Sequence, residues 1–304
     1  MILTVTLNAA LDVTYELDSL AVNGDNRVRQ VRYCGGGKGV NVARLLHSLG
    51  REVMVSGFAG GATGKALQAD LSKSNVQHSF DPVAEESRRT LTVVSGGSAT
   101  LFNEPGPTIE DREWHRYCQH FEALLRDANV VVLSGSLPPG VPVDAYAVLG
   151  EASRAVGVPV VLDADGSALT MGLSAQPIIV KPNQEELARA TGSRVVMTAI
   201  AALRRGGAQN VVASLGEEGL LADTTEGVWR AFPSVRVAGN PIGAGDAVVA
   251  ALTCGVADSS SWSQRLREAI ALSSSTVLEP VAGRADLDAY RRFRHEATVE
   301  RVDL

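Results

Sequence analysis

The sequence contains little cysteine, no long apolar run and no excess of positive charge. Its three cysteines, Cys34, Cys118 and Cys254, are odd in number, widely spaced and without a Cys-x-x-Cys pair, so they indicate neither a disulfide framework nor a zinc cluster. The longest apolar runs, at 130–133 and 156–162, are far shorter than the roughly 18 residues of a membrane-spanning helix. We therefore expect no transmembrane segment and no membrane partner.

The charge balance is acidic, with 28 Lys and Arg against 34 Asp and Glu, a net charge of -6 and a pI near 5.5. A nucleic-acid-binding surface must neutralise phosphates with basic side chains, so small molecules are the expected partners rather than nucleic acid. Met1 leads directly into a strand-like run at 2–7, without a basic stretch ahead of an apolar one. This predicts no secretory signal and a cytoplasmic location.

Short β-branched runs alternate with longer segments of helical period. The expected strands are 2–7, 53–58, 130–133, 158–162, 178–180 and 211–214. The expected helices are 40–49, 65–74, 112–126, 143–156, 184–190, 198–205 and 244–254. This alternation predicts an α/β fold in which helices cover both faces of a mainly parallel sheet. No flexible linker is visible, so we expect one domain over 1–304.

Two stretches interrupt this rhythm, at about 13–33 and 87–103. Both show alternating β patterns with charged positions and no long helix between them. They are expected to pair as a small antiparallel flap and to form a lid over the rim of the large sheet. Exposed edges on such a flap make a homodimer through the lid plausible.

The segment Gly35–Ala43 places four glycines around Lys38, ahead of an apolar helical period. Glycines expose backbone N–H groups, and a helix N-terminus favours anions, so this segment is a candidate phosphate site. A glycine turn with a solvated lysine is the alternative. The Walker pattern does not fit, because Gly39 follows Lys38 where Ser or Thr belongs.

A second glycine segment, 240–247, follows a strand-like run at 235–237 and precedes an expected helix. The amides of Gly243, Ala244 and Gly245 would face a developing phosphoryl charge, and Asp246 could accept a proton from a hydroxyl. The alternative is that Asp246 is only an acidic residue in the first turn of a helix. A dinucleotide fingerprint is not matched, because Val248 stands where a third small residue belongs.

Two further segments follow expected strands. In 181–186, Asn183 and Glu186 lie one helical turn apart and could face a metal or its water shell, or could form an ordinary helix capping box. The turn at 214–219 could lie under a nucleotide, or could simply open a hairpin.

Polar groups at other strand ends could bind a sugar. Serine and backbone amides in 134–140 suit a phosphate, and the Asp12 carboxylate suits two hydroxyls. Arg88 and Arg89, in the second insertion, could clamp a phosphate from the lid, or could be exposed arginines on an edge strand.

Taken together, in this order and spacing, these segments resemble the phosphofructokinase-B (pfkB) group of ribokinase-like carbohydrate kinases. GGGKGVNVA at 35–43 and GAGD at 243–246 match its two signature regions, and SGSLPPG, KPNQEE and SLGEEG agree as well. The resemblance implies a ribokinase-like fold, ATP and Mg²⁺ as cofactors, and a monovalent cation in some members. It assigns Asp246 as the general base and Gly243–Gly245 as the anion hole. It places Asn183 and Glu186 at Mg²⁺. It further implies ATP contacts from Lys181, Asn183, Ser214, Leu215, Gly216, Glu217 and Gly219, and sugar-phosphate contacts from Asp12, Gly36, Gly37, Lys38, Asn41, Arg88 and Ser136.

Lys38 in the glycine run resembles the branch of tagatose-6-phosphate kinases and 1-phosphofructokinases. The implied reaction is transfer of the ATP γ-phosphoryl group to a ketohexose monophosphate. A 6-phosphofructokinase and a kinase of an unphosphorylated sugar remain alternatives within the class. A non-catalytic sugar-phosphate sensor and a nicotinamide dehydrogenase are alternatives of other classes.

Overall fold

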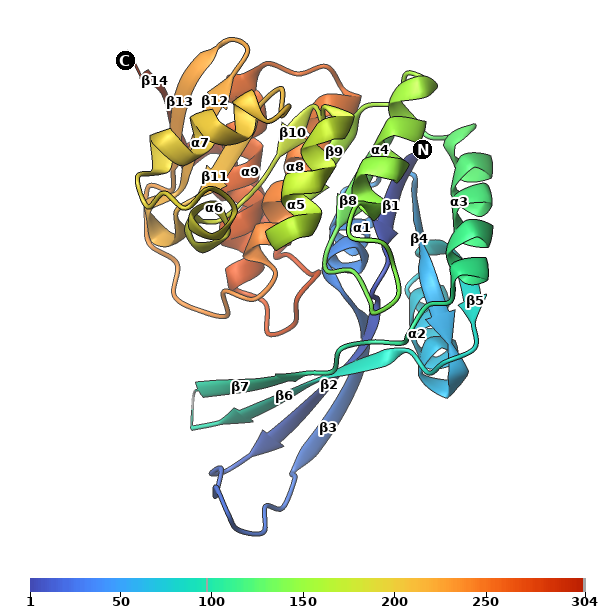
Figure 1. Cartoon of the computed structure of the whole chain (residues 1–304). Helices are drawn as coiled ribbons and strands as arrows, with labels where there is room; N and C mark the ends of the chain where they lie inside the picture. Colours follow the sequence, from blue (N-terminus) through green and yellow to red (C-terminus); the bar gives the residue numbers. More distant parts are fainter. Residues whose placement is uncertain (97, 303–304) are drawn as a thin grey trace.

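A computed structural model describes residues 1–96 and 98–302 of the chain (Figure 1). Its strands are β1 (Ile2–Thr6), β2 (Ala10–Leu17), β3 (Gln30–Gly36), β4 (Val53–Gly60), β5 (Gln77–Val83), β6 (Arg88–Ser95), β7 (Ser98–Asn103), β8 (Val130–Ser134), β9 (Val160–Asp163), β10 (Ile179–Val180), β11 (Val211–Ser214), β12 (Leu220–Thr224), β13 (Gly227–Phe232) and β14 (Thr298–Val302). Its helices are α1 (Lys38–Ser48), α2 (Gly61–Lys73), α3 (Asp111–Leu125), α4 (Ala145–Ala155), α5 (Gly166–Gly172), α6 (Gln184–Thr191), α7 (Val196–Arg205), α8 (Ala244–Ala257), α9 (Trp262–Val277) and α10 (Leu287–Glu296).

A ten-stranded sheet organises the structure, in the order β14-β13-β12-β11-β10-β9-β8-β1-β4-β5. Every neighbouring pair from β5 to β11 runs parallel, whereas β12, β13 and β14 are antiparallel. β1 lies inside the parallel part, where Ile2 pairs with both Val53 and Val130. The α/β fold predicted from the sequence is confirmed, and the carboxyl ends of the parallel strands meet at one edge, where open α/β sheets bind ligands.

The two faces of this sheet carry separate apolar cores. One core includes buried residues of α1, α8 and α9, such as Leu45 and Leu252. The other includes buried residues of α3, α4 and α7, such as Tyr117 and Leu149. Both faces of the parallel strands are therefore covered, which is why central strands such as β1 and β8 are buried along their whole length.

Most predicted elements are found close to their expected bounds, and three helices were missed. These are α5, α9 and α10; α9 contains the serine run 273–275, which hid its helical period. The strand expected at 235–237 is wrong: the segment is irregular, and Val235 is 62% exposed because no neighbouring strand covers it. No helix in the described part of the chain is long and apolar enough to cross a membrane.

The two insertions join in a second, four-stranded sheet with the order β3-β2-β6-β7. Figure 1 shows this sheet projecting from the body beside α2. The expected antiparallel flap is wrong in one respect, because β2 and β6 run parallel. Each insertion is an antiparallel hairpin, but β2 follows β1 and β6 follows β5. Since β1 and β5 point the same way in the main sheet, β2 and β6 leave it in the same direction.

Candidate active site

The two glycine segments meet through the first turns of α1 and α8. Asn41, in α1, donates a hydrogen bond from Nδ2 to Oδ2 of Asp246, in α8, at 2.8 Å. The two residues are 205 positions apart in the chain, and both are buried. Asp246 therefore lies directly beside the segment that carries Lys38, at the carboxyl edge of the main sheet.

Gly243 is the residue that allows α8 to begin here. Its φ of 87° lies in the left-handed region, which side chains with a Cβ rarely adopt. Asp246 follows in the first turn of the helix, where the partial positive charge of the N-terminus favours an anion. The Gly-x-Gly-Asp spacing thus places backbone amides and a carboxylate together at the helix start.

Burial raises the pKa of Asp246 to about 7. The negative charge of Asp163 acts in the same direction, while the Asn41 hydrogen bond and the charges of Lys38 and Lys181 oppose it. A carboxylate with a pKa near neutrality accepts a proton more readily than an ordinary aspartate does. This environment suits Asp246 to the work of a general base.

Four charged side chains form an ionic cluster beside Asp246. Nζ of Lys38 lies 3.4 Å from Oδ1 of Asp163 and 3.3 Å from Oε1 of Glu186. Nζ of Lys181 lies 3.3 Å from the same Oδ1 of Asp163. The Asp163 side chain is 1% exposed and that of Glu186 is 7% exposed, so both carboxylates depend on these ammonium groups. Burial disfavours the charged carboxylate, but Lys181 and Lys38 together hold the pKa of Asp163 below its ordinary value.

Asp163 was not predicted from the sequence. It ends β9, in the run VVLDADG, so a carboxylate at the carboxyl end of a parallel strand was the available signal. Ser134, at the end of the neighbouring strand β8, donates a hydrogen bond from Oγ to Oδ2 of Asp163 at 3.3 Å. The 134–140 segment, which the sequence predicted only as a sugar-phosphate site, therefore contacts this cluster through Ser134.

Asn183 and Glu186 form a helix capping box, one of the two arrangements that the sequence allowed for them. The amide of Glu186 donates to Oδ1 of Asn183, and the amide of Asn183 donates to Oε2 of Glu186, both at 2.8 Å. The capping box does not exclude a role of Glu186 in metal binding, because it uses only Oε2 of this carboxylate. The other oxygen, Oε1, contacts Lys38. The capping box fixes the Glu186 carboxylate at the start of α6.

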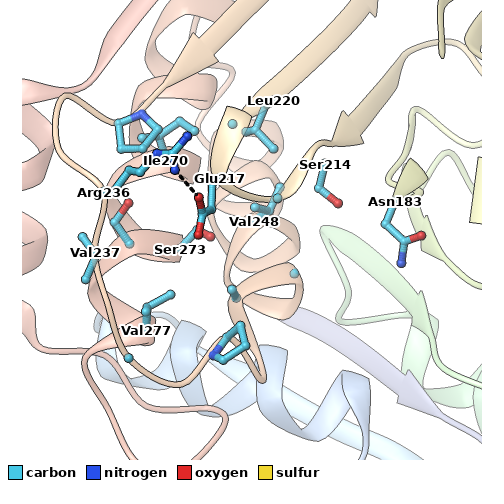
Figure 2. A pocket seen from close by; sticks show the side chains of 18 of the residues that line it. Asn183, Ser214, Glu217, Leu220, Arg236, Val237, Val248, Ile270, Ser273 and Val277 are labelled. Atoms are coloured by element: carbon cyan, nitrogen blue, oxygen red, sulfur yellow. Dashed lines mark ion pairs between the residues drawn. The ribbon is translucent and has the colours of Figure 1, made fainter. Parts of the chain in front are cut away.

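A cavity of about 620 Å³ opens beside this cluster (Figure 2). Asn183 and Ser214 lie on one side of it, and their strand ends are joined by a parallel bridge. Arg236 and Glu217 form a 2.8 Å ion pair on the other side. Of the predicted ATP contacts, the lining includes Asn183, Ser214, Gly216, Glu217 and Gly219 but not Lys181 or Leu215.

No motif in the sequence indicated the apolar part of this cavity. Val237, Val248 of α8, and Ile270 and Val277 of α9 line it (Figure 2). Ala244 and Gly245 also line the cavity, and a Cβ on Gly245 would stand 3.5 Å from Nζ of Lys181. The cavity thus reaches the start of α8, close to the ionic cluster.

Predicted sugar contacts gather where the four-stranded sheet β3-β2-β6-β7, called the lid from here on, meets the rest of the molecule, called the body. Asp12, in β2, lies over Gly36, in β3, so closely that any side chain at position 36 would collide with its carboxylate. Arg88 pairs with Ala10 in the adjoining strand, and its Nε donates to the Asn8 carbonyl at 2.9 Å. Nδ2 of Asn8 also donates to Oγ of Ser136 at 3.2 Å, so residues of the body and the lid meet here.

The two arginines of the lid have different surroundings. Arg88 is half-buried, and its charge opposes the burial that raises the pKa of Asp12 to about 6. Arg89 is exposed and pairs with Glu104 at 3.1 Å. Arg88, rather than Arg89, therefore lies beside Asp12.

The sequence profile described as pfkB family carbohydrate kinase matches residues 5–288. The chain belongs to this family. The resemblance found in the sequence is confirmed, and the protein is an ATP-dependent carbohydrate kinase.

Solved structures of the family are similar over nearly the whole chain. Phosphofructokinase-2 from Escherichia coli in complex with fructose 6-phosphate is 29% identical, with a TM-score of 0.89 over 97% of this kinase and 98% of that chain. The same enzyme in complex with potassium is 28% identical, with a TM-score of 0.90 and the same coverage of 97% and 98%. A Thermotoga maritima protein described as a possible 1-phosphofructokinase is 27% identical, with a TM-score of 0.89 and full coverage (100%) of both chains.

We predict that Asp246→Asn stabilises the folded kinase at alkaline pH. The pKa of Asp246 is about 7 when folded against an ordinary 3.8, so between these values the folded protein holds a proton that the unfolded chain has lost. Stability therefore falls as pH rises through this window, by up to about 4 kcal/mol at 1.36 kcal/mol per pH unit, and the asparagine variant escapes this loss.

Urea unfolding at pH 4 and at pH 8 tests this prediction. The variant should exceed the wild type at pH 8 and match it near pH 4. Asp288→Asn is the control, because the Asp288 side chain is 92% exposed, and it should show no such pH-dependent gain. Equal stability of wild type and Asp246→Asn at pH 8 would contradict the raised pKa.

Proposed function

We propose that this kinase transfers the γ-phosphoryl group of ATP to a hydroxyl of a ketohexose monophosphate, either tagatose 6-phosphate or fructose 1-phosphate. The observation that carries this proposal is the hydrogen bond between Asn41 and Asp246. This bond brings Asp246, the proposed base in segment 243–246, against segment 35–43, which contains Lys38. The sugar acceptor and the γ-phosphoryl group of ATP would therefore bind next to each other.

Asp246 acts as the general base in this proposal. The acceptor hydroxyl oxygen attacks the γ-phosphorus as its proton passes to the Asp246 carboxylate, and the bond from phosphorus to the β-γ bridging oxygen breaks to release ADP. A pKa of about 7 suits this step, because the group is partly ionised at neutral pH and yet basic enough to take the proton. The sugar bisphosphate then leaves with the transferred group.

The start of α8 and the ionic cluster stabilise the charge that develops on the transferred group. The amides of Gly243, Ala244 and Gly245 lie at the helix N-terminus, where the dipole favours an anion. Lys181 lies beside Gly245 and adds a full positive charge. ATP occupies the cavity lined by Asn183, Ser214, Gly216, Glu217 and Gly219, with Lys181 and Leu215 adjoining it.

Glu186 and Asn183 are proposed to hold Mg²⁺, with Asp163 as an additional acidic group. The donor set fits, because Mg²⁺ prefers oxygen ligands and commonly binds one or two carboxylates together with waters and phosphates. Within residues 1–96 and 98–302, no three acidic, histidine or cysteine side chains converge to hold a metal alone, which agrees with a site shared with nucleotide. Bound there, Mg²⁺ would neutralise phosphate charge. The potassium complex of the Escherichia coli enzyme supports a monovalent cation as a further cofactor.

The sugar phosphate is proposed to lie between the cluster and the lid. Asp12 accepts hydrogen bonds from sugar hydroxyls, and Arg88 and Lys38 supply positive charge for phosphate. Gly36, Gly37, Asn41 and Ser136 complete the contacts. The lid sheet would exclude water, which competes as an acceptor.

Fructose 6-phosphate is the rival acceptor, because the Escherichia coli relative binds it. We predict that initial rates of ADP release, measured at saturating MgATP, are highest with tagatose 6-phosphate or fructose 1-phosphate, by at least about tenfold over fructose 6-phosphate and over the free hexoses. Higher rates with fructose 6-phosphate would overturn the proposed identity of the acceptor. Higher rates with a free hexose would show that the phosphate group of the sugar is not needed for binding.

We further predict that Asp246→Asn lowers kcat by about 10²–10⁴-fold, the range ascribed to a positioned base, while the affinity for ATP stays within about twofold. Asp258→Asn is the matched control, because it makes the same change at the other end of α8 and should keep full turnover. Steady-state rates and nucleotide titrations of both variants check this. Unchanged turnover of Asp246→Asn would remove the proposed base.

We also propose a homodimer formed through the lid. The lid has free edges at β3 and β7, and large apolar side chains on these strands are exposed: Val31 by 42%, Tyr33 by 64%, Leu101 by 45% and Phe102 by 54%. Exposed edges and apolar groups of this kind commonly mark an interface. A second lid would cover both features.

The variant Tyr33→Glu with Phe102→Glu should convert this dimer to a monomer, because two charges would be buried in the interface. Size-exclusion chromatography with light scattering at several protein concentrations measures the mass. Val195→Glu, which charges an equally exposed side chain (64%) on the body, serves as the control and should remain dimeric. A wild-type protein that is monomeric at all concentrations would contradict the proposal.

A further inference from the structure

Lys38 lies between the two carboxylates to which a metal is assigned. Its Nζ is 3.4 Å from Asp163 and 3.3 Å from Glu186, and the side chain remains 37% exposed. The charge of Asp163, ahead of that of Glu186, raises the pKa of Lys38 despite its burial. The lysine therefore carries a positive charge at the place where a metal's positive charge would be needed.

These contacts give Lys38 two competing sets of partners. The ammonium group has three donors, and its contacts with Asp163 and Glu186 leave only one for a phosphate of the sugar or of ATP. A divalent cation on Glu186 would repel the ammonium and compete for the same oxygen, Oε1, because Oε2 is already bound by the Asn183 amide. Phosphate groups in the cleft offer the displaced lysine new anionic partners.

Lys181 does not share this conflict. It is 4% exposed, pairs among the described residues with Asp163 alone, and keeps that carboxylate partly neutralised if Lys38 departs. Lys38 begins α1 directly after Gly37, and its long side chain can swing toward the cleft without moving the helix. The cluster thus contains one fixed ammonium group and one that can exchange partners.

We propose that Lys38 is a resident cation that holds the metal site in the free enzyme, and that metal binding releases it to the phosphate groups in the cleft. This inference rests on the proposed assignment of Glu186 and Asp163 to Mg²⁺. The release of Lys38 makes metal binding and phosphate binding interdependent. Both the metal and the phosphate bind better when Lys38 has moved away from Asp163 and Glu186. Coupling of this kind is reciprocal and amounts typically to 5–150-fold in affinity.

Direct binding of Mn²⁺, measured by electron paramagnetic resonance without nucleotide or sugar, tests the competition. Lys38→Met removes the charge and keeps an unbranched side chain one atom shorter, and it should bind Mn²⁺ at least about tenfold more tightly than the wild type. Arg88→Met is the matched control, since Arg88 is a cation of the same cleft that pairs with neither carboxylate, and it should change the affinity less than about twofold. An unchanged or weaker affinity of Lys38→Met would overturn the proposal.

Two further measurements make the result specific. Adding Glu186→Gln to Lys38→Met should abolish the gain, and a gain that persists would place the metal elsewhere and overturn the proposal. In the wild type, which has only the four lysines Lys38, Lys65, Lys73 and Lys181, NMR of ¹³Cε-labelled lysine should show the Lys38 signal move with Mg²⁺ while Lys65 and Lys73 stay unmoved. A Lys38 signal that ignores Mg²⁺ would contradict the release.

These outcomes are independent of the acceptor panel. Lys38→Met could bind Mn²⁺ more tightly while the highest rates of ADP release are found with fructose 6-phosphate. That result would support the release of Lys38 by metal and overturn only the proposed sugar substrate. Highest rates with tagatose 6-phosphate or fructose 1-phosphate, together with unchanged Mn²⁺ binding by Lys38→Met, would overturn only the release of Lys38.

Discussion

Three carboxylates and two ammonium groups lie together at the carboxyl edge of the main sheet, and the charge of each group affects the others. Lys38 lies within 3.4 Å of both Asp163 and Glu186, and Lys181 lies 3.3 Å from Asp163. The two ammonium charges hold the pKa of Asp163 below its ordinary value, although burial acts in the opposite direction. Burial raises the pKa of Asp246 to about 7, because the Asn41 hydrogen bond and the charges of Lys38 and Lys181 offset it only in part. Neighbouring carboxylates of one region therefore differ in how readily they bind a proton.

The main sheet and its helices create the conditions for this balance. Parallel strands end at the same edge, so Asp163 after β9, Asn183 after β10 and Ser214 after β11 reach one region without any long connection. The first turns of α1 and α8 close it from the other side through Asn41 and Asp246. Because both helices are anchored by fully buried residues such as Leu45 and Leu252, the polar groups at their ends are held in place.

The lid has the opposite character to the body. It is built from two hairpins that leave the main sheet at the carboxyl ends of β1 and β5, and its outer strands carry exposed apolar groups. It contributes Asp12 and Arg88 only where it meets the body. Asp246, the first turn of α8 and the ionic cluster lie instead on elements of the main sheet and its helices.

The sequence by itself determined the parallel α/β sheet, the two insertions and most of the residues that meet at the cleft. Those signals are local: β-branched runs, helical periods and glycines around Lys38 and before Asp246 act through backbone preferences and burial. It did not determine the parallel pairing of β2 with β6, the irregular course of 235–237, the apolar wall from α9 or the role of Asp163. These depend on which segments lie side by side, and charges change their properties only when the folded chain buries them together, so the tertiary structure alone decided the pairing of Lys38 and the pKa of Asp246.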